Sequence, residues 1–311
     1  MINKFQKTTP ILLTAGTNYL DIDAYACMVG MAELLQLQGF NAMAYSTAPC
    51  NYSVCKTLIE EGQILHELPR NFDFKAAKYI IVDVSDPEFL ENSISLNQVI
   101  GVYDHHVGFE EYWKSCIGEN ACIEFIGAAA TLIYREWVNA GMLDKMTSST
   151  AKLLIAAILD NTLNLTSSVT TQEDTDAFYQ LCLQWNIKED WCVAYFSEVQ
   201  ISIESDLKNA LFGDVKNIRD NSVLPSHMGQ IALWNVDSIL GKAEEISQWF
   251  NKCYENWMLN IIDIQHNCNY FVCNNREYQR RIEQVFGVHF KAGVAKTLVS
   301  YLRKEIIKKT L

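Results

Sequence analysis

One short segment constrains this chain more than any other: Asp104-His105-His106, which directly follows the apolar residues 99–103. It places one carboxylate and two adjacent imidazoles at the point where a buried strand should end. Charged groups cost several kcal/mol to bury unless they are paired or bound to a metal ion. The segment therefore indicates a functional site rather than a packing feature.

Three other apolar runs also end in carboxylates. The runs are 11–13, 79–82 and 153–159, and the residues that follow or close them are Asp21 with Asp23, Asp83, and Asp160. In an open parallel sheet, the carboxyl ends of the strands line one crevice, where ligands bind. Clustered Asp and His side chains are ligands for hard divalent cations. Together the four segments predict a metal site that holds two ions.

Each residue also has a simpler explanation when it is taken alone. Asp21 and Asp23 could cap a helix, since Asp is favoured at helix N-termini. Asp83 could form an Asx turn, and Asp160 could be an ordinary carboxylate at a helix end. His105 could be a surface histidine. Their joint occurrence favours the metal site.

Strands and helices alternate along the first part of the chain. Expected strands cover 11–14, 41–45, 78–82, 98–103 and 121–125, and expected helices cover 23–38, 53–61, 128–140, 147–159 and 172–185. This alternation predicts an α/β fold with a Rossmann-like, doubly wound parallel sheet. The helical stretch 188–212 contains no glycine or proline and holds the boundary between a first domain, 1–197, and a second domain, 198–311.

The second domain is expected to be a smaller α/β unit. Its expected strands are 228–234, 258–265 and 270–273, and its expected helices are 236–257 and 295–309.

Composition excludes some functions. The net charge of −12 argues against an extended nucleic-acid surface, which needs a basic face. No apolar stretch is long enough to span a membrane. The ten cysteines contain no CxxC pair, so we expect reduced thiols in a cytoplasmic protein. A zinc site at His266, Cys268 and Cys273 is a weaker alternative, because no fourth ligand is evident.

The four segments resemble the signature motifs of the DHH phosphoesterase superfamily, in order and spacing, over about the first 190 residues. The resemblance implies two divalent metal ions, with Mn2+ favoured and Mg2+ or Co2+ as alternatives. It implies that Asp83 bridges the ions and that His106 contacts the phosphate as a catalytic residue. Asp104 would orient an imidazole. The implied metal ligands are Asp21, Asp23, Asp83, His105 and Asp160.

The second domain favours one branch of that superfamily, the family II pyrophosphatases and exopolyphosphatase-like (prune-like) proteins. Asp206-Leu207-Lys208 and residues 228–232 resemble that branch, and residues 287–293 match the glycine-rich loop of the other branch only in part. The implied substrate is pyrophosphate or a short polyphosphate, and a homodimer is compatible with the resemblance. Cationic side chains of a lid would bind the substrate: Lys208, also a catalytic candidate, Lys291, Lys296 and Arg303.

One residue departs from the pattern. Most of the superfamily has a histidine four residues before the first motif Asp, whereas this chain has Thr17. The exopolyphosphatase-like group also lacks this histidine. Two alternatives stay open: a nanoRNase or phosphoadenosine-phosphate phosphatase, and a metal-binding regulatory protein without turnover.

Overall fold

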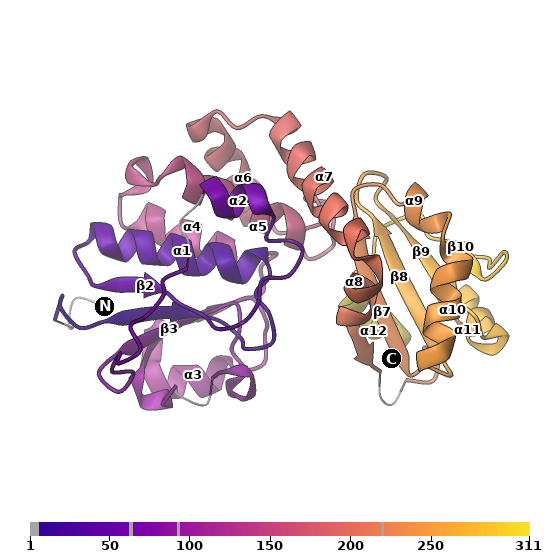
Figure 1. Ribbon diagram of the computed structural model, residues 1–311, viewed down its shortest axis with the longest axis horizontal. Coiled ribbons are helices and arrows are strands. Elements are labelled where there is room, and N and C mark those ends of the chain that lie inside the picture. Colours follow the sequence, from indigo (N-terminus) through magenta and orange to yellow (C-terminus); the bar gives the residue numbers. More distant parts are fainter. Residues whose placement is uncertain (1–5, 62–64, 92–93, 219–220) are drawn as a thin grey trace. The chain divides into compact units, whose positions relative to one another are not determined.

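The computed structural model describes residues 6–61, 65–91, 94–218 and 221–311. The chain divides into two compact units (Figure 1). The first contains residues 1–165 and 169–192, and the second contains residues 166–168 and 193–311. Helix α7 (Glu189–Ser205) spans this division.

The first domain is built on a parallel sheet whose strand order is β2-β1-β3-β4-β5. Every neighbouring pair in it is parallel. The strands are β1 (Ile11–Thr14), β2 (Ala42–Ala44), β3 (Lys78–Val82), β4 (Val99–Asp104) and β5 (Ala121–Ile123). The predicted doubly wound α/β fold is confirmed.

Helices cover both faces of this sheet (Figure 1). Helix α3 (Glu110–Ile117) lies on one face, and α1 (Ile22–Leu37), α4 (Ala129–Asn139) and α5 (Ser148–Asn161) lie on the other. The remaining helices are α2 (Lys56–Glu61) and α6 (Gln172–Trp185). Helix α1 is apolar on nearly all sides because it is buried between the sheet and α4 and α5.

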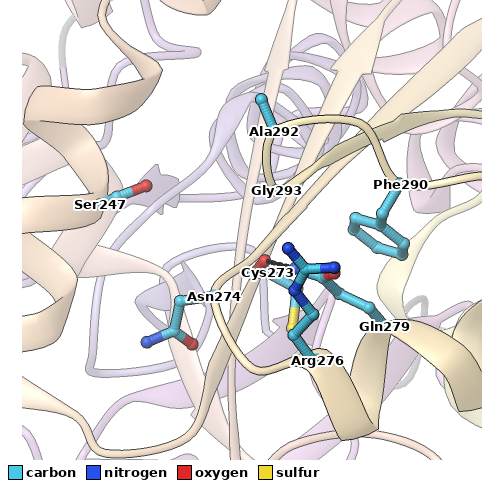
Figure 2. Close-up of a pocket in the computed structure, with 8 residues that line it drawn as sticks. All are labelled: Ser247, Cys273, Asn274, Arg276, Gln279, Phe290, Ala292 and Gly293. Atoms are coloured by element: carbon cyan, nitrogen blue, oxygen red, sulfur yellow. Dashed lines mark hydrogen bonds between the residues drawn. The ribbon is translucent and has the colours of Figure 1, made fainter.

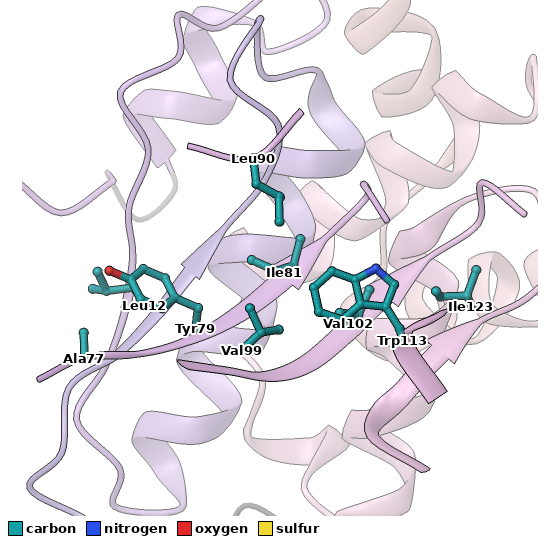
Figure 3. Packing of buried hydrophobic residues seen from close by; sticks show 9 residues of the cluster. All are labelled: Leu12, Ala77, Tyr79, Ile81, Leu90, Val99, Val102, Trp113 and Ile123. Carbon is teal, nitrogen blue, oxygen red and sulfur yellow. The ribbon is translucent and has the colours of Figure 1, made fainter. Parts of the chain in front are cut away.

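A hydrophobic cluster holds α3 against the sheet (Figure 3). Trp113 of α3 is fully buried and packs with residues of β3 and β4 that include Ile81 and Val102. Its indole N–H donates to the Ser85 carbonyl at 2.6 Å. This bond fixes the loop after β3, which carries one of the motif aspartates.

The second domain contains a mixed sheet whose strand order is β10-β9-β8-β7-β6. The strands are β6 (Val215–Asn217), β7 (His227–Leu233), β8 (Trp257–Asp263), β9 (Cys268–Cys273) and β10 (Val294–Lys296). Only β7 and β8 pair in parallel, and the other neighbours are antiparallel.

Helices also cover both faces of the second sheet. Ile282 of α11 (Arg276–Phe286) and Ile306 of α12 (Arg303–Thr310) pack with Met228 and Met258 on one face. On the other face, Phe250 of α10 (Ala243–Cys253) stacks at 4.9 Å on Phe212 of α8 (Leu207–Gly213). The short helix α9 (Asp237–Leu240) precedes α10.

Three sequence predictions in this region need correction. The predicted helix 236–257 is two helices, α9 and α10, and Trp257 begins a strand. The stretch 188–212 is divided at Asp206 into α7 and α8. The predicted terminal helix 295–309 is wrong at its start: Val294–Lys296 is an edge strand, and the helix begins only at Arg303.

Buried amides explain why the chain between β10 and α12 is not helical. The Asn269 side chain donates to the Tyr301 carbonyl at 2.7 Å and accepts from the Tyr301 N–H at 2.8 Å. Asn260 donates to the same carbonyl at 3.0 Å. These bonds satisfy backbone groups that a helix would otherwise pair internally.

None of the ten cysteines forms a disulfide. Within the described residues, no helix is both long enough and apolar enough to cross a membrane.

Candidate metal centre

Carboxylates and imidazoles of the first domain gather at the carboxyl edge of its sheet. Asp83 follows β3, Asp104 is the last residue of β4, and His105 and His106 come next. Asp21 is the N-cap of α1, the helix that follows β1. Because β1, β3 and β4 are parallel neighbours, their carboxyl ends meet at one edge.

Asp83 stands at the middle of this group. Its backbone is left-handed (φ +56°), a region that Asp enters more readily than most residues but that still costs energy. Its Oδ1 atom is buried and has no hydrogen-bond partner in the part of the chain that the structure describes. This oxygen lies 3.4 Å from His105 Nε2 and 3.9 Å from His106 Nδ1.

The ring of His105 is oriented by a backbone carbonyl. Its Nδ1 lies 3.2 Å from the Ile126 carbonyl oxygen. A carbonyl can only accept, so Nδ1 carries the proton and the lone pair of the neutral ring is on Nε2. That nitrogen lies 3.4 Å from Asp83 Oδ1 and 4.0 Å from Asp23 Oδ2. His105 therefore presents a metal-binding nitrogen to two carboxylates.

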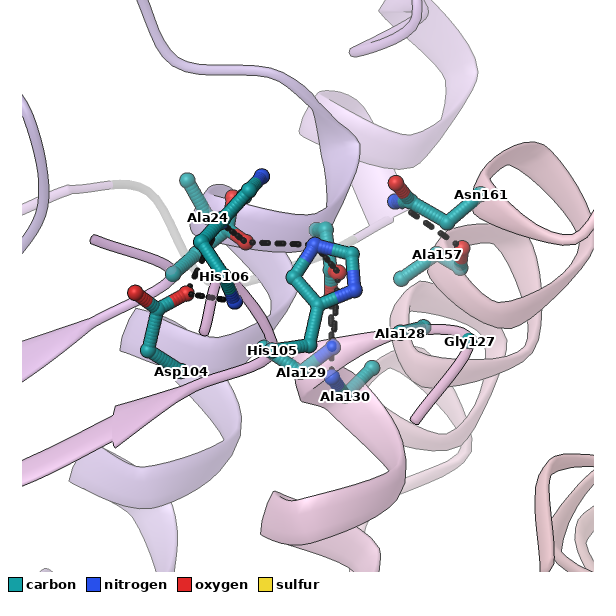
Figure 4. Close-up of polar contacts among 12 residues, drawn as sticks. Ala24, Asp104, His105, His106, Gly127, Ala128, Ala129, Ala130, Ala157 and Asn161 are labelled. Carbon is teal, nitrogen blue, oxygen red and sulfur yellow. Dashed lines mark hydrogen bonds and ion pairs between the residues drawn. The ribbon is translucent and has the colours of Figure 1, made fainter. Parts of the chain in front are cut away.

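His106 is oriented by Asp104 instead. Asp104 Oδ1 accepts from the His106 backbone N–H at 3.1 Å and from its Nδ1 at 2.8 Å (Figure 4). Burial would raise the pKa of Asp104, but its hydrogen bonds with His106 and Ser85 and the charge of the His106 ring together outweigh burial and hold the pKa below its usual value. The His106 side chain is 58% exposed, whereas that of His105 is 3% exposed. The two adjacent histidines thus differ: one is enclosed and the other faces outward.

Asp21 and Asp23 do act as helix caps, as the simpler explanation predicts. Asp21 Oδ1 accepts from the Ala24 N–H at 3.0 Å, at the start of its own helix. Asp23 is fully buried and caps a different helix: its two oxygens accept from Ala129 and Ala130 of α4, each at 2.8 Å. Carboxylate oxygens have further lone pairs, so capping does not prevent either group from binding a cation.

The electrostatics of this edge call for a cation. Burial, followed by the charge of Asp21, raises the pKa of Asp23 to about 7. Burial, followed by the charges of Asp21 and Asp23, raises the pKa of Asp83 well above its usual value. Converging carboxylates repel one another unless protons or metal ions compensate them. The orphaned Asp83 oxygen and the Nε2 lone pair of the neutral His105 ring therefore fit a divalent cation.

One group of three side chains has metal-ligand spacing among the described residues: Asp83, His105 and His106, whose ligand atoms lie within 4.8 Å of one another. Sequence reasoning assigned His106 to the phosphate and not to a metal. His266, Cys268 and Cys273, the weaker zinc alternative, do not form such a group in the described chain.

Thr17 lies in the loop between β1 and α1, and Asp160 lies in α5, at the end of the predicted helix 147–159. The Thr17 hydroxyl and backbone N–H both donate to the Phe89 carbonyl, at 3.2 and 3.0 Å. Asp160 lies in the last turn of α5, half-buried, and α5 packs against α1. The role of Asp160 as a ligand remains a prediction.

The four predicted substrate cations all belong to the second domain. Lys208 lies 6.0 Å from the Trp249 ring centroid, and Lys296 lies 5.2 Å from that of Tyr270. Lys291 is exposed. The Arg303 guanidinium is bound to Asp214, with 2.6 Å between Nη2 and Oδ1. Their roles toward a substrate stay predictions.

Sequence reasoning missed two supports of the centre. Ser85 is buried, and its hydroxyl donates to the His106 carbonyl at 3.0 Å. The second support is the backbone N–H of Ala129 in α4, which donates to Asp23, a residue 106 positions earlier in the chain. Ser85 stands two residues after Asp83, so its role could have been predicted from the sequence. The backbone N–H groups of α4 leave no residue-specific signal, so their contact with Asp23 could not have been predicted.

A cavity of about 330 Å³ lies in the second domain (Figure 2). It is lined by Ser247 of α10, by Arg276 and Gln279 of α11, and by the loop before β10. The Gln279 amide donates to the Cys273 carbonyl at 2.6 Å. Arg276 is the one charged lining residue, so the cavity lacks the acidic and imidazole groups of the first-domain edge.

No family model matches this chain. The chain is 25% identical to the "Probable manganese-dependent inorganic pyrophosphatase" of Deinococcus radiodurans, over 94% of each chain. A protein of the same name from Staphylococcus epidermidis is 23% identical, over 88% of this chain and 89% of that one.

Two solved structures share the fold. A Methanococcus jannaschii protein assigned to family II of the inorganic pyrophosphatases has a TM-score of 0.66 and 17% identity, over 96% of this chain and 99% of that one. An exopolyphosphatase-related protein from Bacteroides fragilis has a TM-score of 0.53 and 13% identity, over 97% of this chain and 90% of that one.

The fold and the strand-end Asp and His residues define a two-domain α/β protein with a candidate metal site at the carboxyl edge of its first sheet. The chain is similar, over nearly its whole length, to proteins named manganese-dependent inorganic pyrophosphatases. The resemblance predicted from its sequence motifs is confirmed.

Proposed function

We propose that this protein is a divalent-metal-dependent hydrolase that cleaves phosphoanhydride bonds of pyrophosphate or short polyphosphate. Manganese is the favoured metal, because the similar curated proteins are named manganese-dependent. Two ions would be held by Asp21, Asp23, Asp83, His105 and Asp160, with Asp83 between them. The second domain would supply cationic side chains to the substrate.

One observation carries the proposal. Asp83 Oδ1 is buried without a hydrogen-bond partner among the described residues and lies 3.4 Å from a histidine nitrogen whose lone pair is fixed by Ile126. A backbone in the left-handed region holds that oxygen in place. Packing alone does not explain a strained Asp83 backbone, repulsion between neighbouring carboxylates and a buried oxygen without a hydrogen-bond donor at the same place.

When bound, divalent ions supply Lewis acidity toward the phosphoryl group and lower the pKa of an attacking water. The chain supplies positioning and charge. His106 presents Nε2 outward because its Nδ1–H is held by Asp104, so Nε2 can donate to a phosphoryl oxygen when the ring is protonated. The buried carboxylate of Asp104 stabilises that protonated ring.

The test is phosphate release with manganese, measured for pyrophosphate, tripolyphosphate, phosphoadenosine phosphate and a dinucleotide, with alkaline phosphatase added after quenching for the dinucleotide. The variant Asp83→Asn suits it best, because Asn also adopts left-handed backbone and the change removes only the charge. Asp144→Asn, at an exposed position, is the matched control.

We expect turnover of the inorganic substrates, lost in Asp83→Asn and retained in Asp144→Asn. Full activity of Asp83→Asn would contradict the proposed mechanism. Cleavage of the nucleotides alone would place the protein with the nanoRNases or phosphoadenosine-phosphate phosphatases. Absence of any turnover, with manganese still raising the melting temperature, would identify a metal-binding protein in which Thr17 is the residue to change to His.

A further inference from the structure

The second domain repeats, at the end of β8, the arrangement that orients His106 at the end of β4. Asp263 is the last residue of β8 and is 2% exposed. Its Oδ1 accepts from the His266 backbone N–H at 3.1 Å, and both of its oxygens accept from His266 Nδ1, at 3.0 and 2.9 Å. The His266 side chain is 54% exposed, close to the 58% of His106.

This geometry fixes the outward atom of His266. A carboxylate has no proton to give in its ionised form, so Nδ1 donates and Nε2 points away from the buried acid. When the ring carries a proton on both nitrogens, Nε2 can donate to an anion. The hydrogen bonds of the buried Asp263 carboxylate to the exposed His266 ring give this carboxylate an orienting role.

A second cation stands at the same edge of this sheet. Cys268 begins β9 directly opposite Asp263, and Lys296 ends β10. The ammonium of Lys296 lies 5.2 Å from the centroid of the Tyr270 ring, and Lys296 pairs with Tyr270 across the β9–β10 ladder. Lys296 is nevertheless exposed. Asp263 can balance one of the two positive charges, which leaves a net positive charge at this edge when His266 is protonated.

We propose that His266, oriented by Asp263, and Lys296 form a phosphoryl-binding subsite of the second domain. The ligand class is a doubly or more highly charged phosphate chain, and the inference rests on the proposed function for the substrate's identity. His266 and Lys296 contact phosphoryl oxygens, and Asp263 is the positioning residue. No bond is made or broken by this subsite.

The kinetic test uses His266→Ala and Lys296→Ala in the full chain with manganese. We expect each to raise KM for pyrophosphate roughly tenfold or more, the value of one charged hydrogen bond, with a much smaller change in kcat. His289→Ala is the matched control, because that side chain is 96% exposed and its nearest carboxylate, Glu283, is 4.0 Å away. It should leave KM unchanged.

A binding measurement separates this inference from the proposed function. The imidazole resonances of His266, assigned by their loss in His266→Ala, are followed by NMR as imidodiphosphate is added with Mg2+. We expect them to shift in the wild type and to shift less in Lys296→Ala. Asp263→Asn should weaken the effect of imidodiphosphate on the ring while the fold, checked by circular dichroism, is retained.

The outcomes are distinct. A wild type that turns over no phosphoanhydride refutes the proposed function, and the NMR titration still decides the subsite. A wild type that does turn over, with KM of His266→Ala within twofold of its own value or with unmoved His266 resonances, overturns the subsite alone.

Discussion

A single hydrogen bond of 2.8 Å, between Asp104 and His106, decides which nitrogen of that imidazole faces outward. The carboxylate is buried, and the ring it holds is more than half exposed. Charge and orientation therefore come from a residue that need not touch a substrate. At this scale the chemistry depends on the partner of the histidine as much as on the histidine.

Asp104→Asn tests this dependence. The amide oxygen can still accept from Nδ1, but the compensating negative charge is lost, so the protonated ring is less favoured. We expect kcat for pyrophosphate to fall about 10- to 100-fold, the usual effect of losing such a partner, while the circular dichroism spectrum is retained. An unchanged kcat would show that the pairing is only structural.

Several residues of the site could be predicted because their signal is local. Asp83, Asp104 and His105 follow apolar runs that end at one edge of a parallel sheet. The different capping roles of Asp21 and Asp23 could not be predicted from the sequence. Asp21 caps its own helix, whereas Asp23 reaches a helix that begins more than 100 residues later, and only the folded chain distinguishes them.

At the scale of elements, the start of α4 is seated by buried carboxylates. Gly127 lies just before this helix, and its N–H donates to Asp174 at 2.9 Å. A Cβ at Gly127 would lie 2.6 Å from that carboxylate and 2.7 Å from the Thr162 methyl group. The small residue is therefore required by space rather than by backbone conformation.

Gly127→Ala should destabilise the protein by about 1–3 kcal/mol, because neither buried neighbour can move aside freely. It should also reduce turnover, since the displaced helix carries the donors of Asp23. Denaturant unfolding and phosphate release measure the two effects. The control is Gly213→Ala, where an added Cβ meets nothing within 4 Å. Equal stability of the two variants would contradict this account.

Helices and strands could be predicted well where one hydrophobic periodicity dominates the segment. They were predicted less well where hydrogen bonds of buried polar side chains determine the backbone conformation. The strands of the first sheet and α4, α5 and α6 lie close to their predicted bounds. The chain after Val294 has the composition of a helix, yet pairing with β9 and the Asn269 contacts with Tyr301 keep its start extended. Such long-range bonds are invisible to local propensity.

At the scale of the whole molecule, stability is linked to pH through the acidic edge. In the metal-free protein the folded-state pKa of Asp23 is about 7, above its ordinary value of 3.8. The folded state therefore binds this proton more tightly than the unfolded state does. The linkage relation then requires stability to fall as pH rises from the unfolded pKa through the folded one.

We expect the metal-free protein to lose about 2–3 kcal/mol of unfolding free energy from Asp23 alone between about pH 5 and about pH 7.5. Guanidinium unfolding with a chelator measures it, and Asp23→Asn should flatten the dependence. Added manganese should restore stability most at the higher pH, where the carboxylates are ionised. A metal-free wild type whose unfolding free energy falls no more steeply over this range than that of Asp23→Asn would contradict the linkage.

The bond between Asp23 and the first turn of α4 also bears on biosynthesis. The carboxylate belongs to the first helix of the chain, and its donors, Ala129 and Ala130, are synthesised more than a hundred residues later. Until they leave the ribosome, a growing chain holds Asp21, Asp23, Asp83 and both histidines without the helix that seats them. Early metal capture by this unfinished edge would fix ligands before their support exists. Asp23 can therefore take its folded position only after α4 has been synthesised.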